Sequence, residues 1–225
     1  MKNVCKNFGT LEVLRNISFD IEKGETVVFF GPSGCGKTTL LNIISGIETL
    51  TSGSIEVASN KIAYVFQDDR LIPWKTALQN ILFVMENPDS SIAKRILKTV
   101  ELENFENIKP SKMSGGMRKR LNLARALVVK PQLVLMDEPF SSVDLKTKFS
   151  LMDFLKSLLR GEIESALIVS HDPEEAAVLG DKIIIIGGRP STIKEVVTPD
   201  VNKFDRKFNY IQELVLKIRN LLQTL

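Results

Sequence analysis

Short, uninterrupted apolar runs recur along the chain and predict strands that are covered on both faces. These runs are residues 26–30, 61–66, 133–136, 166–169 and 183–186. An apolar run without alternation is typical of a parallel strand that is packed between two layers of helices. Helical patterns separate most of the runs, so we expect an α/β domain with a mainly parallel sheet core.

Alternating apolar and polar residues predict a smaller antiparallel β part toward the N-terminus. Residues 17–21 and residues 55–57 alternate in this way. Such alternation is typical of strands with one exposed face. We expect both segments to be strands of this antiparallel part.

The pattern becomes mainly helical after Gln67, which predicts a helical subdomain inserted into the core. Asp89, Ser90 and Ser91 are candidate caps for a helix over residues 92–100. Apolar residues at helical spacing from Phe204 to Leu222 predict an amphipathic helix that packs on its own domain. Because no Pro- or Gly-rich linker divides the chain, we expect a single domain. Its expected parts are a core of residues 1–67 and 115–200, a helical subdomain of residues 68–114 and a terminal helix within residues 201–225.

Composition excludes several classes of protein. The chain has 225 residues, 44% of them hydrophobic, and a net charge of +3, which argues against nucleic acid as the main partner. Its two cysteines, Cys5 and Cys35, offer no disulfide framework and fit a reducing compartment. The aliphatic run 183–186 is too short to span a bilayer, and the first residues lack the apolar segment of a signal peptide. We therefore expect an intracellular protein without a membrane anchor of its own.

Residues 31–38 fit the phosphate-binding pattern G-x-x-x-x-G-K-[ST]. They lie between a predicted strand and a predicted helix, where backbone amides and the positive helix end can surround a phosphate chain. Lys37 would reach the β and γ phosphates, and the Thr38 hydroxyl would ligate Mg²⁺. The alternative is a merely flexible glycine turn, which this context disfavours.

Two acids follow another predicted strand. Asp137 can hold Mg²⁺ through water, while Glu138 can orient and polarise an attacking water. Without Lys37 elsewhere in the chain, solvated acids at a strand end would explain the pair equally well.

A second candidate phosphate site is formed by Ser114, Gly115, Gly116 and Met117, which precede a predicted helix over residues 118–127. Ser114 is a candidate N-cap, and the glycines leave the first-turn amides open to an anion. The alternative is an ordinary capped helix. The basic run at residues 118–120 is most simply a solvated helix face.

The ordered set of these motifs resembles the ATP-binding cassette (ABC) ATPase family over almost the whole chain. The set comprises residues 31–38, Gln67, residues 114–117, Asp137, Glu138, residues 141–144 and His171. The resemblance implies a P-loop NTPase fold and hydrolysis of ATP with Mg²⁺. It also implies that the motif at residues 114–117 completes the ATP site of a second copy of this chain or of a related ATPase subunit.

The family's functional residues carry over position by position. By resemblance, Gln67 senses Mg²⁺ and the attacking water, His171 contacts the γ-phosphate, Asp144 helps the two subunits communicate, and Phe8 stacks on adenine, although an isolated Phe is more often a core residue. Met113 and Met117 depart from the commonest form of the family's motif, and Met117 cannot donate a side-chain amide hydrogen bond. The expected catalytic residues are Lys37, Gln67, Glu138 and His171, and the expected Mg²⁺ ligands are Thr38, Gln67 and Asp137. The expected ATP-binding residues are Phe8, Gly31, Pro32, Ser33, Gly34, Cys35, Gly36, Lys37, Thr38, Thr39, Ser114, Gly115, Gly116 and Met117.

Residues 65–76, Met117 and residues 188–193 are similar to the nitrate, sulfonate and taurine importer branch of the family. This likeness implies a peripheral protein on the cytoplasmic membrane face that powers import of a small solute. A separate permease would carry the solute, and an extracytoplasmic solute-binding protein would select it. Leu71 and Trp74 would contact the permease, although Trp74 fits a core position of the helical subdomain almost as well. An exporter or a lipid-transfer ATPase is the alternative function.

Overall fold

The computed structural model describes residues 1–58 and 61–223. Its main sheet has six strands in the order β5-β6-β7-β3-β8-β9. All neighbours are parallel except β8 and β9, which pair antiparallel. The strands are β3 (Thr26–Phe30), β5 (Ile62–Val65), β6 (Leu133–Asp137), β7 (Ser165–Ser170), β8 (Lys182–Gly187) and β9 (Thr192–Val197). The prediction of a mainly parallel core is confirmed.

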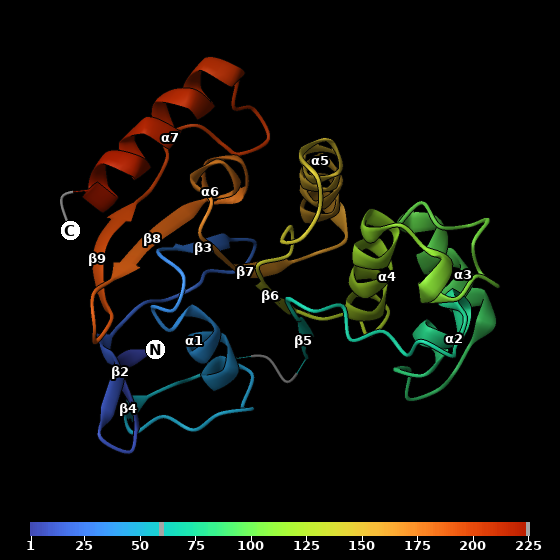
Figure 1. Ribbon diagram of the computed structural model, residues 1–225, viewed down its shortest axis with the longest axis horizontal. Coiled ribbons are helices and arrows are strands. Elements are labelled where there is room, and N and C mark those ends of the chain that lie inside the picture. Colours follow the sequence, from blue (N-terminus) through green and yellow to red (C-terminus); the bar gives the residue numbers. More distant parts are fainter. Residues whose placement is uncertain (59–60, 224–225) are drawn as a thin grey trace.

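Helices cover both faces of this sheet, which explains why its parallel strands are mainly apolar (Figure 1). Along β3, Val27 and Phe29 enter one hydrophobic core together with α1 (Lys37–Ile44). Val28 and Phe30 enter the other core, which the helices α4 to α7 help to build. Successive side chains of a strand point to opposite faces, so continuous apolarity fills two cores at once.

The second sheet is antiparallel and smaller than predicted. Its order is β2-β1-β4, with β1 at Lys2–Phe8, β2 at Leu11–Ile17 and β4 at Ser52–Ser54. The predicted strand at residues 17–21 is wrong, because the ladder ends where Ile17 pairs with Val4. Phe19 then packs edge-on against Phe29, with ring centroids 4.8 Å apart. Apolar contacts with the core therefore produced the alternation there. Residues 55–57 likewise follow β4 without forming a strand, and Ile55 packs against the same core.

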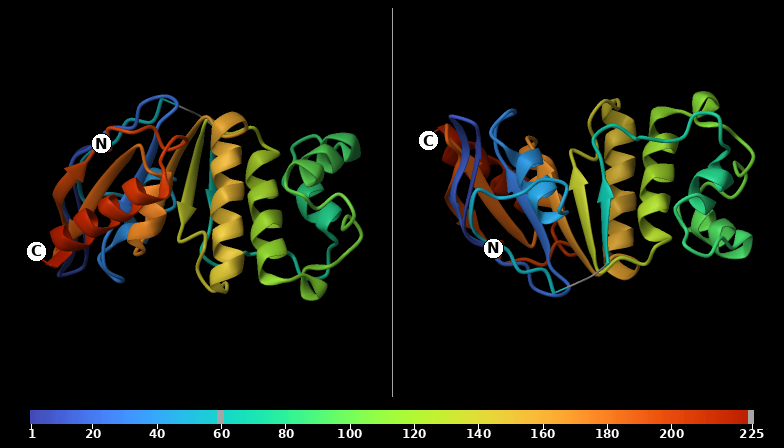
Figure 2. Two further views of the ribbon diagram at one scale, coloured as in Figure 1. Left: turned by 90° about the horizontal axis from the view of Figure 1, so that it is seen from above. Right: turned by 90° about the horizontal axis from the view of Figure 1, so that it is seen from below.

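Helices α2 (Ala77–Leu82) and α3 (Ser90–Thr99) lie on the side of α4 (Gly115–Leu127) that faces away from the sheet, as Figures 1 and 2 show. A short 3₁₀ turn over Pro110–Lys112 precedes α4. The predicted helix at residues 92–100 begins two residues earlier, because Asp89 accepts the amides of Ser91 and Ile92 as its N-cap.

The C-terminal helix α7 (Phe208–Gln223) packs on α6 (Pro173–Leu179), as Figure 1 shows. Its buried residues include Leu214, Val215 and Ile218, so the predicted packing on its own domain is confirmed. Phe204, which was expected within the helix, precedes it. None of the helices in the described ranges has both the length and the apolar character that a membrane span requires.

Asn80 is a fully buried polar residue that shapes the loop before α2. Its Oδ1 accepts the amide of Ile72 at 2.8 Å, and its Nδ2 donates to the carbonyls of Ile72, Lys75 and Thr76 at 3.0–3.2 Å. The loop held in this way leaves Trp74 72% exposed. The alternative that placed Trp74 in a helical core is therefore wrong.

We predict that Asn80→Ala lowers the free energy of unfolding by about 2 kcal/mol, because it leaves a buried amide and buried carbonyls without partners. For a chain of this size that corresponds to a fall of about 4–8 °C in the melting temperature. Lys94→Ala, an exposed change on α3, should leave stability within about 0.5 kcal/mol. Equal melting temperatures for the two variants would contradict the role of Asn80.

Candidate functional site

Strand register brings the sequence motifs to one edge of the main sheet. Phe30 at the end of β3 pairs with Ser170 at the end of β7, and Val169 of β7 pairs with Asp137 at the end of β6. The phosphate loop, Glu138 and His171 begin directly after these strands, so they leave the sheet side by side. The carboxyl ends of parallel strands are where α/β proteins bind their ligands.

The phosphate loop needs glycine at two positions for different reasons. A Cβ on Gly31 would lie 2.3 Å from the carbonyl oxygen of Ile186 in the neighbouring strand β8. Gly36 has φ +91°, and a Cβ there would lie 2.9 Å from the side chains of Val13 and Leu14. These two residues let the loop turn tightly between the sheet and the first helix.

Cys35 faces away from solvent in this loop, and burial raises the pKa of its thiol. Pro32, Ser33, Gly34 and Thr38 are exposed. The loop therefore offers its outer backbone to a ligand and keeps its cysteine inside.

Lys37 turns back into the phosphate loop. It is only 5% exposed, and its Nζ donates to the carbonyls of Gly31 and Pro32 at 2.8 and 2.9 Å. The ammonium group is therefore held inside the loop, where an anion bound to the backbone amides would meet it.

Thr38 and Asp137 form the centre of the site. The Thr38 hydroxyl donates to Asp137 Oδ1 at 3.1 Å across 99 residues of sequence. Burial raises the pKa of the Asp137 carboxyl, although the Thr38 hydrogen bond and the charge of Lys37 act in the opposite direction. A nearby cation would therefore favour the ionised form of this carboxyl. Tyr64 lies close enough that the charge of Asp137 adds to the effect of burial in raising the pKa of its hydroxyl.

Glu138 lies between two other predicted site residues. Its Oε1 is 3.1 Å from His171 Nδ1, and its Oε2 accepts from Gln67 Nε2 at 3.4 Å. The backbone of Glu138 has φ +42°, which is unusual for a residue with a side chain, and its amide donates to Val169 at 3.1 Å. The structure thus brings Gln67, Glu138 and His171 together at the exposed end of the sheet.

Residues 114–117 form a separate helix start. Ser114 caps α4, and its hydroxyl accepts the Met117 amide at 3.3 Å. A Cβ on Gly116 would lie 2.8 Å from Thr147 Cγ2, so this turn packs closely against the start of α5 (Leu145–Gly161). Within residues 1–58 and 61–223, no hydrogen bond links this helix start to the phosphate loop. The helix start and the phosphate loop are therefore two separate candidate anion sites.

The basic run after this motif is not a solvated face, so that prediction is wrong. The Lys119 side chain is 8% exposed, donates to the Gln67 carbonyl at 2.7 Å and lies 3.4 Å from Asp69. Arg120 stacks on Phe154, 4.5 Å from the ring centroid. Lys119 shares a helix face with buried Asn122 and Leu123, a signal that a count of charges overlooks.

Phe8 and Asp144 lie outside the central group. Phe8 is 46% exposed on β1, with Lys6 Nζ 4.6 Å from the centre of its ring, so it is not a core residue. Asp144 caps α5 by accepting the Thr147 amide at 3.0 Å. Lys148 lies in the same first turn, with a side chain that is only 12% exposed, and it was not predicted from the sequence. The signal for Lys148 was its place on the apolar face of α5, in line with Leu151 and Leu155.

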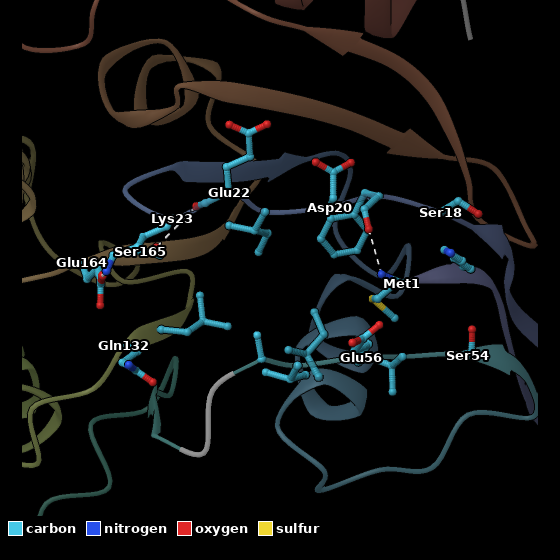
Figure 3. Close-up of a pocket in the computed structure, with 18 residues that line it drawn as sticks. Met1, Ser18, Asp20, Glu22, Lys23, Ser54, Glu56, Gln132, Glu164 and Ser165 are labelled. Carbon is cyan, nitrogen blue, oxygen red and sulfur yellow. Dashed lines mark hydrogen bonds and ion pairs between the residues drawn. The ribbon is translucent and has the colours of Figure 1, made fainter.

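A hollow of about 940 Å³ lies elsewhere on the chain (Figure 3). Its lining includes Leu133 and Ser165, the first residues of β6 and β7. It therefore opens at the amino ends of the strands, opposite the phosphate loop. The edge where α/β proteins bind their ligands is formed by the carboxyl ends of the strands, where the phosphate loop lies.

Three comparisons agree with this geometry. A family profile described as ABC transporter matches residues 14–141. The chain is 42% identical to the aliphatic sulfonates import ATP-binding protein SsuB 2 of Pseudomonas syringae pv. tomato, over 84% of this chain and 82% of that protein. It is 36% identical to an uncharacterized ABC transporter ATP-binding protein of Methanocaldococcus jannaschii, over 96% of this chain and 86% of that protein.

A solved relative has the same fold. The dimeric structure of an ATP-binding cassette in a post-hydrolysis state, bound to ADP and Pi, superposes with a TM-score of 0.75 at 32% identity. The match covers 88% of this chain and 97% of that chain. The phosphate loop, the acids at the end of β6 and the separate capped helix thus occur within a cassette fold. The chain belongs to the ABC transporter family, as an ATP-binding and ATP-hydrolysing subunit that powers membrane transport.

Proposed function

We propose that the groups at the carboxyl edge of the sheet act together on one ATP molecule. Lys37 neutralises the β and γ phosphates, and the amides of the phosphate loop hold their oxygens. Gln67 and Glu138 face the attacking water, and His171 contacts the γ-phosphate. The observation that carries this proposal is the meeting of Glu138 with both Gln67 and His171 beside the loop.

Mg²⁺ fits the oxygen atoms available beside the loop. In the part of the chain that the structure describes, no group of three or more histidine, cysteine or acidic residues could form a metal cage. Mg²⁺ commonly needs few protein ligands because it keeps waters and phosphate oxygens. Thr38 and Asp137, whose oxygens lie 3.1 Å apart, would hold it, with Gln67 beside them. The ion would supply positive charge to the phosphates when bound.

In hydrolysis, water attacks the γ-phosphorus in line with its bond to the β–γ bridging oxygen. That bond breaks, so ADP leaves and inorganic phosphate forms. Glu138 accepts a hydrogen bond from this water and orients it. Gln67 and His171 restrict the Glu138 carboxylate from two sides. Lys37 and the amides at residues 31–38 stabilise the negative charge that develops on the phosphoryl oxygens.

The open helix start at residues 114–117 completes the site of a second subunit, either a copy of this chain or a related ATPase. Exposed Leu145 and Phe149 lie one helical turn apart at the start of α5, beside this motif. An apolar pair of this kind suits a subunit contact. The expected assembly is a head-to-tail dimer with two shared ATP sites.

We predict that Glu138→Gln still binds ATP and lowers the rate of hydrolysis by roughly 10²–10⁴-fold, because the amide orients water but is a poor base. Lys37→Ala should instead weaken ATP binding by about tenfold or more, since it removes a charge-assisted contact. Equilibrium binding and single-turnover hydrolysis separate the two effects. Normal turnover by Glu138→Gln would remove Glu138 from the mechanism.

We further propose that the transported solute is a small organic anion, with an aliphatic sulfonate as the first candidate. The support is the similarity to relatives that are named as aliphatic sulfonates import proteins. In this proposal the chain lies on the cytoplasmic face of the membrane and drives a separate permease. An extracytoplasmic solute-binding protein delivers the solute.

Leu71 and Trp74 are proposed to touch the permease. Trp74 lies in the loop that Asn80 holds, and its exposed fraction of 72% leaves a large aromatic surface uncovered. Phe83, 64% exposed, ends the helix that follows. ATP-driven closure of the dimer would move this surface, because the backbone at Gln67 leads directly into the loop.

We predict that Trp74→Ala weakens recovery of the permease by about thirtyfold in affinity, as expected for a buried aromatic anchor, and leaves ATP hydrolysis by the isolated chain unchanged. Phe208→Ala is the matched control, since Phe208 is 73% exposed on α7. Affinity capture from membranes measures both variants. Equal losses of the permease for the two variants, or no loss for either, would exclude a specific contact at Trp74.

The direction of transport is tested by gentle purification of the chain from its native membrane. Recovery of a permease together with an extracytoplasmic solute-binding protein supports import, and that protein can be titrated with aliphatic sulfonates. A membrane partner without a solute-binding protein would favour export or lipid transfer. A wholly soluble partner would contradict transport of any kind.

A further inference from the structure

His171 lies between Ser170 and Asp172, and the side chains of both residues form hydrogen bonds within the protein. Ser170 is 1% exposed, and its hydroxyl donates to Glu175 Oε2 at 2.5 Å. The same hydroxyl accepts the Asp172 amide at 2.9 Å, and Asp172 caps α6 by accepting the Glu174 amide at 2.8 Å. The backbone on both sides of His171 is therefore fixed by buried polar contacts.

Lys148 forms ion pairs with both Asp172 and Glu175. Its Nζ pairs with Asp172 Oδ2 and lies 2.7 Å from Glu175 Oε1. The Lys148 side chain is 12% exposed and that of Glu175 is 7% exposed, so solvent screens this pair little, whereas the Asp172 side chain is 30% exposed. Burial raises the pKa of Glu175, while the hydrogen bond from Lys148 opposes the shift. The Lys148 ammonium group thus balances the charge of two neighbouring carboxylates, which would otherwise repel each other.

Lys148 belongs to the first turn of α5, whose opposite side faces outward. The Lys148 amide donates to the Asp144 carbonyl at 2.9 Å, which places it one turn from the cap. Its neighbours Leu145 and Phe149 are 73% and 46% exposed. Thr147 in the same turn packs against Gly116. The first turn of α5 therefore contacts the motif at residues 114–117 and belongs to the surface proposed for the second subunit. The same turn forms ion pairs with the segment that follows His171.

We infer that Lys148 is a positioning residue for ATP hydrolysis, which holds His171 through Asp172 and Glu175 and makes its position depend on the subunit-facing start of α5. The inference rests on the proposed roles of His171 and of the dimer. Lys148 touches no phosphate in this arrangement. It acts through the backbone of residues 170–172, so a shift of α5 on dimer closure moves the histidine.

The test is single-turnover hydrolysis and ATP binding by the full chain with Lys148→Met. We expect hydrolysis to fall by about tenfold to hundredfold, because small misplacements of a site residue cost this much, while ATP affinity changes less than about twofold. Lys148→Arg keeps the charge and the donors and should recover most of the rate. A Lys148→Met rate equal to that of the unaltered chain would overturn the inference.

A matched control distinguishes positioning from general stability. Lys203 is 3% exposed and pairs with Asp181 and with Thr26 Oγ1 at the amino end of β3, away from the phosphate loop. Lys203→Met should lower the melting temperature and leave hydrolysis per folded molecule unchanged. Should Lys148→Met not fold, the double variant with Glu175→Gln removes the ammonium and a negative charge together, and the same measurements are made on it.

Hydrolysis by Lys148→Met is also measured in a chain that carries His171→Ala. This comparison distinguishes failure of this inference from failure of the proposed function. If His171→Ala hydrolyses ATP normally, the proposed role of the histidine is wrong. If His171→Ala is slow, Lys148→Met should add little to the loss of rate, because both changes remove the same contribution, that of a correctly placed His171. A loss by the same factor in both backgrounds would show that Lys148 acts independently of His171 and would overturn the inference.

Discussion

The register of three parallel strands is the constraint on which the rest of the structure depends. β6, β7 and β3 lie next to one another, and their last residues are aligned, so Gly31, Glu138 and His171 follow at one edge. Each strand sends alternate side chains into two separate cores. A slip by one residue would exchange the two sets of side chains, so packing in the two cores fixes the positions of Gly31, Glu138 and His171.

Helix α4 connects the motif at residues 114–117 to the segment around Gln67 within one chain. Helix α4 begins at the Ser114 cap, and its Lys119 holds the Gln67 carbonyl one to two turns later. Arg125, farther along the helix, donates to the Arg70 carbonyl at 2.7 Å. The helix proposed to contact a second subunit is thus hydrogen-bonded to the loop that carries Trp74. In the proposed assembly, closure of the dimer would therefore move the surface that is proposed to contact the permease.

Local patterns predicted the core of the fold because each buried strand reads as a short apolar run, and because the starts of α3 and α4 carry the caps Asp89 and Ser114. The phosphate loop and the acids at the end of β6 are likewise contiguous motifs. The sequence did not reveal contacts that span the chain, such as Lys148 with Glu175. A lysine on an apolar helix face was the available signal, but its carboxylate partners lie on another helix. The predicted strand at residues 17–21 failed because β2 ends at Ile17. Phe19 exchanges backbone hydrogen bonds with Met1, and its ring packs on Phe29 in the core.

The proposed function depends on sharing of each ATP site between two subunits. To test it, a Lys37→Ala subunit is mixed with a Ser114→Arg subunit, at an ATP concentration where each alone hydrolyses little ATP, and single-turnover hydrolysis by the mixture is measured. In a shared arrangement, one site of the mixed dimer combines an intact phosphate loop with an intact Ser114 motif, so hydrolysis returns. If each chain formed a complete site by itself, the mixture would be as inactive as the separate variants, and the account would be contradicted.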